Sequence, residues 1–143
     1  MALPFAHATR AATTLLAAWQ SDSEQHIGLF EAGEAQWSVR RALAVPTRAH
    51  GLWAEADGSV LAVARRPGDW LLRWQPRSGK TQWHWTGEDR RFNGHVVPGP
   101  GGAALWTTET DLDTAQGLIG VRDARSLEKT GEWPTHGMDP HQL

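Results

Sequence analysis

The chain contains 143 residues with a formal net charge of −2, and 40% of its residues are apolar and 21% charged. This balance is typical of one globular domain with a sizeable core. The net charge argues against a general nucleic-acid-binding protein, which needs a dense positive surface. The sequence has no cysteine, which excludes disulfides, thiolate metal sites and cysteine nucleophiles. No run of 18 apolar residues occurs, so we expect no membrane-spanning helix.

The N-terminal segment, Met1 to Trp19, has only a short apolar run, from Ala11 to Trp19, interrupted by two threonines. A cleaved export signal needs a basic start and a stronger apolar region, so we expect none here. If this N-terminus is the native one, the protein is expected in the cytoplasm. The one helix that we predict spans Ala6 to Trp19.

Farther along the chain, three histidines recur at near-constant spacing: His50, His95 and His141 are 45 and 46 residues apart. After each of the first two, an apolar segment, a glycine-centred turn and a second apolar segment follow. Asp57-Gly58 and Gly101-Gly102 occupy the two turns. Both regions are therefore predicted to be β-hairpins.

Each repeat continues with a third and a fourth predicted strand. The third strands are expected at 27–32, 71–76 and 119–124, and the fourth strands carry Trp37, Trp83 with Trp85, and Trp133, at intervals of 46 to 50 residues. Four short strands in about 45 residues are typical of a β-propeller blade. We predict an all-β fold of about three four-stranded antiparallel blades from an incomplete ring. Residues 1–143 form a single domain in this prediction, with blades at 15–45, 46–91 and 92–140.

The sequence contains nine tryptophans. We expect most of them to pack between blades, where large flat side chains fill the space between sheets. Trp83 and Trp85 should point to the same side of one strand, because side chains alternate with period two. An aromatic cage around a ligand is the alternative.

Six runs of residues together resemble a known family: 50–51 (His-Gly), 64–68 (Ala-Arg-Arg-Pro-Gly), 92–95 (Phe-Asn-Gly-His), 108–111 (Thr-Glu-Thr-Asp), 117–124 and 137–141. They resemble the bacterial propeller family called domain of unknown function 1513, over about Leu16 to Leu143. The resemblance implies a seven-bladed propeller, similar in shape to lactonase-like and YVTN-type propellers, that is usually exported to the periplasm. No activity is established for the family, so the resemblance implies a fold and not a reaction.

Members of that family are more than twice as long as this chain, which stops where a fourth unit would begin. Closed propellers have about 4–8 blades, and three blades leave two sheet faces uncovered. Uncovered apolar faces mark an interface or an aggregation liability. We therefore expect either a truncated chain, whose partner is the remaining blades, or copies that associate into a homo-oligomer. Neither nucleic acid nor membrane is an expected partner.

Blade geometry brings polar residues from different repeats to one face. Successive strands run antiparallel, so the start of a first strand and the end of a second strand lie on the same side of the ring. Histidines lie at the start of the first strands, and arginines and acids follow the second strands. Phe92 and Asn93 are expected in the connection that enters the third blade. The predicted ligand-binding residues are His50, Arg65, Arg66, Phe92, Asn93, His95, Glu109, Asp111 and His141.

The three histidines allow several interpretations. Imidazole suits zinc, copper, iron or nickel, but ligands would have to meet across blades. The alternatives are a structural hydrogen-bond network, contact with a metal or other ligand, and proton transfer. No cofactor other than this candidate metal at His50, His95 and His141 is predicted.

The acidic segment at Glu109, Asp111 and Asp113 only loosely resembles a calcium loop, which needs more oxygen ligands. We expect it to be a solvated loop or to pair with Arg65 on the neighbouring blade. Such a pair, if exposed, contributes little stability.

For the function, we expect an uncharacterised non-catalytic binding or scaffold protein whose histidine-, arginine- and acid-lined face holds a small ligand, a metal or a protein. One alternative is a lactonase-like metal-dependent hydrolase, with the metal at the ring axis. The other is a shortened, inactive remnant. No catalytic residue is predicted.

Overall fold

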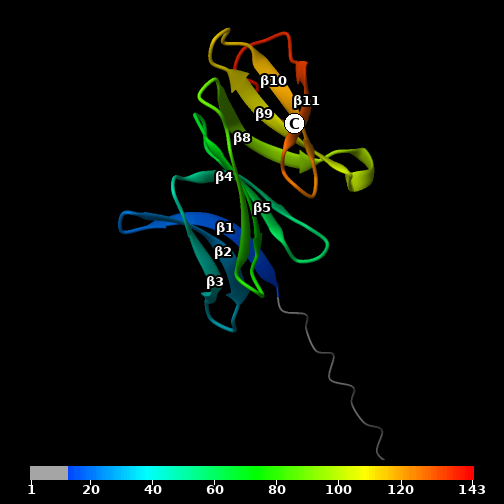
Figure 1. Cartoon of the computed structure of the whole chain (residues 1–143). Coiled ribbons are helices and arrows are strands. Elements are labelled where there is room, and N and C mark those ends of the chain that lie inside the picture. Colours follow the sequence, from blue (N-terminus) through cyan, green and yellow to red (C-terminus); the bar gives the residue numbers. More distant parts are fainter. Residues whose placement is uncertain (1–12) are drawn as a thin grey trace, which may run out of the picture.

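The computed structural model describes residues 13–143, which form three antiparallel sheets arranged in succession along the chain (Figure 1). The first sheet consists of β1 (Thr14–Ser21), β2 (Glu24–Ala32) and β3 (Trp37–Val45). The second consists of β4 (Ala49–Ala54), β5 (Val60–Ala64), β6 (Trp70–Gln75) and β7 (Lys80–Trp85). The third consists of β8 (Arg90–Pro98), β9 (Ala104–Asp111), β10 (Gly117–Asp123) and β11 (Lys129–Pro134), with the short 3-10 turn η1 (Pro100–Gly102) between β8 and β9. The all-β prediction of incomplete propeller blades is confirmed.

Both predicted hairpins form around the glycines that the sequence places there. Gly58 has a φ of 83° in the turn between β4 and β5, and Gly101 and Gly102 have φ of 76° and 71° between β8 and β9. These left-handed conformations favour glycine because it has no Cβ. The Asp57 carboxylate also accepts a hydrogen bond from the Ser59 amide at 2.8 Å, which closes the first turn.

The predicted helix over Ala6 to Trp19 is wrong where the structure describes it. Thr14 to Trp19 belong to β1, which pairs with β2 along its whole length. Pairing places Leu16 against the core, so tertiary packing outweighs the local helical tendency. The rest of that prediction, and the start of the segment judged for an export signal, lie outside the described residues. The first sheet has three strands in residues 13–143 where four were predicted.

Within residues 13–143, no helix has the length and apolar character needed to cross a membrane.

The second sheet is the middle layer, because β5 is buried on both faces. Val60, Ala62 and Ala64 belong to an apolar cluster shared with the first sheet, whereas Leu61 and Val63 belong to a cluster shared with the third sheet. All five residues are no more than 2% exposed. Strand side chains alternate between faces, so one five-residue strand supports two layers.

Fewer tryptophans pack between the sheets than the sequence predicted. Trp70 and Trp74 are buried in the cluster between the first two sheets, and Trp83 packs against it. The rings of Trp83 and Trp85 stack with centroids 5.8 Å apart, which confirms that they point to the same side. Four tryptophans are 41–51% exposed and do not fill space between the sheets: Trp37, Trp53, Trp85 and Trp133.

Candidate functional site

The structure brings together the three histidines that recur in the sequence. His50 lies in β4, His95 in β8, and His141 in the C-terminal segment that follows β11. One ring nitrogen of each lies within 4.8 Å of the others. The ring centroids are 5.1 Å apart for His50 and His95, 5.0 Å for His95 and His141, and 5.8 Å for His50 and His141. We call this group the histidine cluster.

Two glycines next to the histidines allow β4 and β8 to approach each other closely. A Cβ on Gly51 would lie 2.5 Å from the carbonyl oxygen of Gly94, and a Cβ on Gly94 would lie 2.9 Å from the His50 ring. Gly94 also has a φ of 102°, which disfavours any other residue. A glycine therefore lies next to each of the first two histidines, where the backbones of β4 and β8 come into contact.

The first two histidines also lie where strand pairing is interrupted. The register of β4 against β5 shifts between Ala49 and Gly51, and that of β8 against β9 shifts between Phe92 and Val96. His50 and His95 fall inside these irregularities. A bulge changes the direction of a side chain relative to the regular pleat, and bulges recur next to functional sites.

Two members of the histidine cluster, His50 and His95, favour the neutral imidazole. Burial lowers the pKa of His95, and the neighbouring His50 and His141 rings lower it further. Burial, His141 and three nearby arginines lower the pKa of His50 in the same way. The Nε2 atom of His95 is buried and has no hydrogen-bond partner among the described residues. A neutral ring with an unsatisfied nitrogen is the form that binds a metal.

The C-terminal segment that carries His141 is held by contacts on both of its sides. The Gly117 amide donates a hydrogen bond to the Gly137 carbonyl at 2.8 Å, and the Thr135 amide donates to the Gly117 carbonyl at 2.9 Å. Arg66 pairs with Asp139 at 2.5 Å, and both side chains of this pair are about half exposed. Such an exposed pair contributes little stability, but it lies two residues before His141.

Two of the predicted ligand-binding residues are buried and have structural roles. Phe92 and Asn93 lie within β8 and not in a connection, and both are buried. Phe92 belongs to the core, with the Arg122 guanidinium 4.7 Å from its ring centroid. The Asn93 amide exchanges two hydrogen bonds with the Thr110 hydroxyl, at 2.9 and 3.1 Å.

The prediction for Glu109, an exposed loop or a pair with Arg65, is also wrong. Glu109 lies inside β9 and is 0% exposed. Its carboxylate accepts hydrogen bonds from the Thr107 hydroxyl at 2.6 Å, Arg122 at 2.7 Å and Lys129 at 2.9 Å. Burial raises the pKa of Glu109, but these partners outweigh it and the pKa lies below its usual range. Both oxygens of the Glu109 carboxylate therefore already have hydrogen-bond partners within the protein.

Asp111 pairs with Arg90 at 2.6 Å and not with Arg65. Its other carboxylate oxygen accepts hydrogen bonds from the amides of Asp113 and Thr114, at 2.9 and 3.0 Å. These hydrogen bonds lower the pKa of Asp111. The segment is an ordinary side-chain-capped turn, in which this carboxylate already has protein partners.

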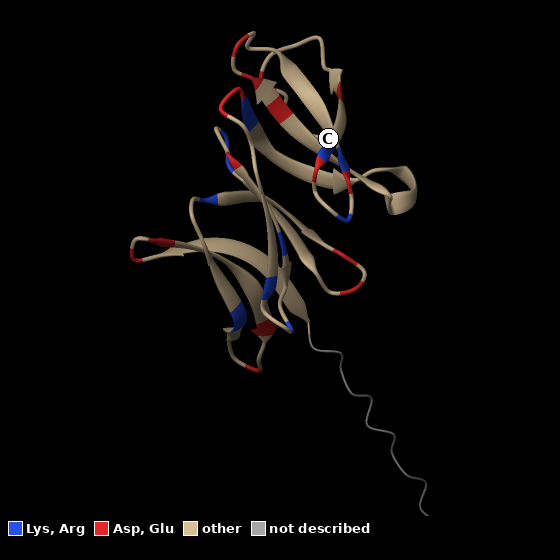
Figure 2. Cartoon of the chain, in the orientation of Figure 1, with Lys and Arg blue, Asp and Glu red and all other residues tan. Residues whose placement is uncertain are grey.

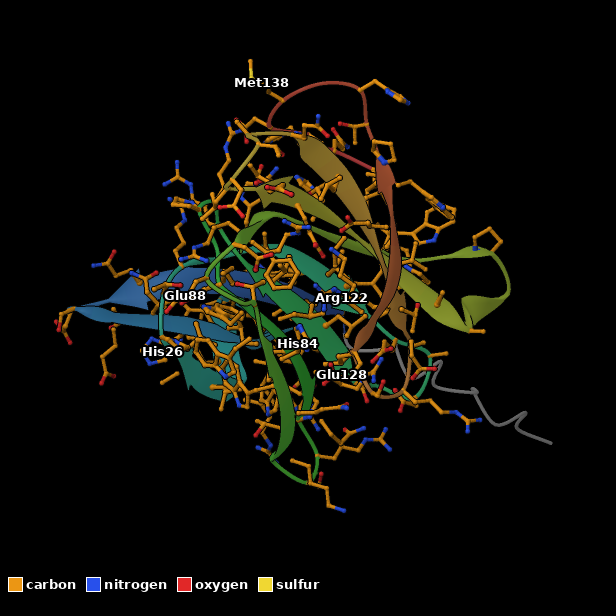
Figure 3. All side chains as sticks on the ribbon, turned by 45° about the horizontal axis from the view of Figure 1, so that its top comes forward. His26, His84, Glu88, Arg122, Glu128 and Met138 are labelled. Atoms are coloured by element: carbon orange, nitrogen blue, oxygen red, sulfur yellow. The ribbon has the colours of Figure 1, made fainter. Side chains whose placement is uncertain are left out.

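Sequence reasoning missed a group of ionisable side chains between the second and third sheets, of which Figure 3 labels His84, Arg122 and Glu128. His84 of β7 lies 3.6 Å from Glu128, which precedes β11. Burial lowers the pKa of His84, and Arg122 lowers it further. Arg122 itself joins Glu109 in a pair whose side chains are 2% and 1% exposed. No local spacing in the sequence signals these pairs, because the partners are 13 or more residues apart.

Sequence reasoning also missed Arg48 and Arg91, which lie near Arg65 and Arg66 at one surface hollow. The only available signal was the position of Arg48, two residues before His50.

Comparison with known proteins places the chain in a family. The model of the family described as "Protein of unknown function (DUF1513)" matches residues 43–143, which is most of the chain. The chain belongs to this family. The resemblance stated from the sequence is therefore confirmed for DUF1513. Comparison with curated proteins found no match.

A solved structure supports the fold of this DUF1513 chain. The crystal structure of Citrobacter koseri AztD, a propeller-type protein, matches with a TM-score of 0.53 and 16% sequence identity. The match covers 97% of this chain but 39% of the AztD chain, so this chain spans well under half the length of that neighbour. At this identity the likeness shows the fold alone, that of an incomplete propeller.

Proposed function

We propose that this DUF1513 chain is a metal-binding module that holds a first-row transition-metal ion, with zinc as the reference ion, at the histidine cluster. One observation carries the proposal: three imidazole nitrogens from three separate segments converge within 4.8 Å. Imidazole is the commonest protein ligand for such ions.

The size of the histidine cluster is compatible with a bound ion. Zinc binds imidazole nitrogen at about 2.0–2.1 Å, which sets the nitrogens of a tetrahedral site about 3.4 Å apart. The nitrogens, at most 4.8 Å apart, would therefore have to close by up to about 1.4 Å, which rotation of partly exposed side chains can supply. Binding would also give the buried His95 Nε2 a partner, which removes the penalty of an unsatisfied polar atom.

Binding is better supported than hydrolysis. Three protein ligands leave a coordination position for water or another ligand, as a lactonase-like enzyme would also need. The acids that the sequence offered for proton transfer are occupied, however, because Glu109 and Asp111 are held by Arg122, Lys129 and Arg90. The group of candidate ligands consists of imidazoles only. These observations support the role of a carrier or sensor of the ion.

The proposal is tested by zinc titration of metal-depleted protein in a calorimeter. We expect one zinc ion per chain, and a loss of affinity of at least about tenfold, or about 1.4 kcal/mol, in His95→Asn. His136→Asn is the matched control, because His136 is exposed and lies outside the cluster. Its φ of 59° is also one that asparagine tolerates.

Absence of stoichiometric zinc binding, or equal affinity in the wild type and His95→Asn, would exclude the proposed site. A lactone-hydrolysis assay on the zinc-loaded protein separates the two functions. Hydrolysis that disappears in His95→Asn and persists in His136→Asn would establish an enzyme instead of a binding module.

A further inference from the structure

Four arginines line one hollow in the surface next to the histidine cluster. The hollow has a volume of about 320 Å³, and its lining residues are Thr47, Arg48, Arg65, Arg66, Pro67, Asp69 and Arg91. The lining includes four arginines and one aspartate, a formal excess of three positive charges, in a protein whose net charge is −2. Figure 2 shows the basic segments before β4, after β5 and at the start of β8 along the same side of the molecule.

Backbone hydrogen bonds bring these arginines together from segments far apart in the sequence. The Arg65 amide donates to the Arg48 carbonyl at 2.8 Å. Gly68 and Phe92 exchange two backbone hydrogen bonds, at 2.9 and 2.7 Å, which sets Arg91 beside the turn that follows Arg66. Because these hydrogen bonds are between backbone groups, the fold itself fixes the relative positions of the residues that line the hollow.

The positive charge of the hollow is only partly balanced by protein groups. In residues 13–143, the side chains of Arg48 and Arg65 have no hydrogen-bond or ion-pair partner. Arg91 donates only to backbone carbonyls, including that of Gly87 at 3.0 Å. Arg66 has one partner, Asp139, in an exposed pair. Like charges repel when they are gathered together, and a bound anion relieves that repulsion.

We propose that this hollow binds a small multivalent oxyanion, a phosphate or a polycarboxylate, with Arg48 and Arg65 as its principal donors. The planar guanidinium presents N–H groups in a fork that matches the oxygens of carboxylate and phosphate. The volume lies at the lower end of the range for small-molecule sites. The site differs in chemistry from the histidine cluster, and the inference does not require a metal.

The test is calorimetric titration of chelator-treated, metal-free protein with inorganic phosphate, citrate and acetate at constant ionic strength, because exposed charges are screened by salt. We expect saturable binding of phosphate or citrate, and much weaker binding of monovalent acetate. Arg48→Gln and Arg65→Gln should each weaken binding at least about fivefold, as expected for loss of a charge-assisted hydrogen bond. Asp69→Asn should strengthen binding, because it removes the opposing carboxylate.

Arg77→Gln is the matched control, since Arg77 is exposed and lies in the turn between β6 and β7, outside the hollow. Tighter binding of phosphate than of citrate would assign the ligand to the phosphate class, and the reverse would assign it to polycarboxylates. Three results would each overturn the proposal: no saturable binding, binding equal to that of acetate, or equal losses in Arg65→Gln and Arg77→Gln. Urea denaturation of each variant checks that an altered affinity does not come from unfolding.

Discussion

The ion pair between Glu109 and Arg122 makes a quantitative prediction for Glu109→Gln. The carboxylate accepts three hydrogen bonds, and the pair is essentially inaccessible to solvent, with side chains 1% and 2% exposed. Replacement by glutamine retains the shape but leaves the buried Arg122 guanidinium without its counter-charge. Removing one partner of a buried pair destabilises a protein by about 3–5 kcal/mol. Because domains have only about 5–15 kcal/mol of unfolding free energy, the effect should be large.

Urea denaturation followed by tryptophan fluorescence measures this change. In a separate thermal denaturation, for a domain of this size, we expect the melting temperature to fall by roughly 10 °C or more. Glu128→Gln is the control, because the Glu128 side chain is 72% exposed and its removal should change the unfolding free energy by less than about 0.5 kcal/mol. A loss below about 1 kcal/mol in Glu109→Gln would refute the reasoning, since it would mean that the pair contributes as little as a surface pair.

Three further predictions concern the same network and the histidine cluster. Gly120→Ala should destabilise the protein by about 1–3 kcal/mol in urea denaturation, because its Cβ would collide with the Glu109 carboxylate; wild-type stability would contradict this packing. The lowered pKa values of His50 and His95 mean that the unfolded chain takes up protons first as the pH falls below about 6.5, so the free energy of unfolding should fall between about pH 7 and 5. A variant with asparagine at both positions should show a shallower decline, and an unchanged slope would rule the assignment out. Arg66→Gln removes the pair that helps hold the C-terminal segment and should weaken zinc binding by no more than about fivefold; a larger loss would show that the pair does more than position this segment.

The sequence was sufficient to predict the layers and the meeting of the histidines. Period-two alternation and glycine turns locate strands such as β5, and repeats of one fold place equivalent residues at equivalent positions. His50, His95 and His141 are therefore expected on one face from the sequence alone. The adjacent Gly51 and Gly94 were visible too, but their meaning appears only when β4 and β8 are seen to approach.

The residues that sequence reasoning misplaced are those whose environment depends on contacts distant in the chain. Glu109 looked like part of an acidic loop, yet burial in β9 becomes favourable because Arg122 and Lys129 come from neighbouring strands. Arg48 and Arg91 were not among the predicted site residues, and only the backbone hydrogen bonds between separate segments bring them to one hollow. The spacing of residues along one strand contains no information about such partners.

The position of the histidines also links ligand occupancy to the integrity of the layered fold. His50 belongs to the second sheet, His95 to the third, and His141 to the segment beyond it. An ion held by all three would act as a non-covalent crosslink, because it binds only while the sheets are docked. At a concentration of one hundred times the dissociation constant, such a ligand adds about 2.7 kcal/mol to the stability of the docked state. Loss of the ion would therefore remove this contribution from the junction between the second and third sheets.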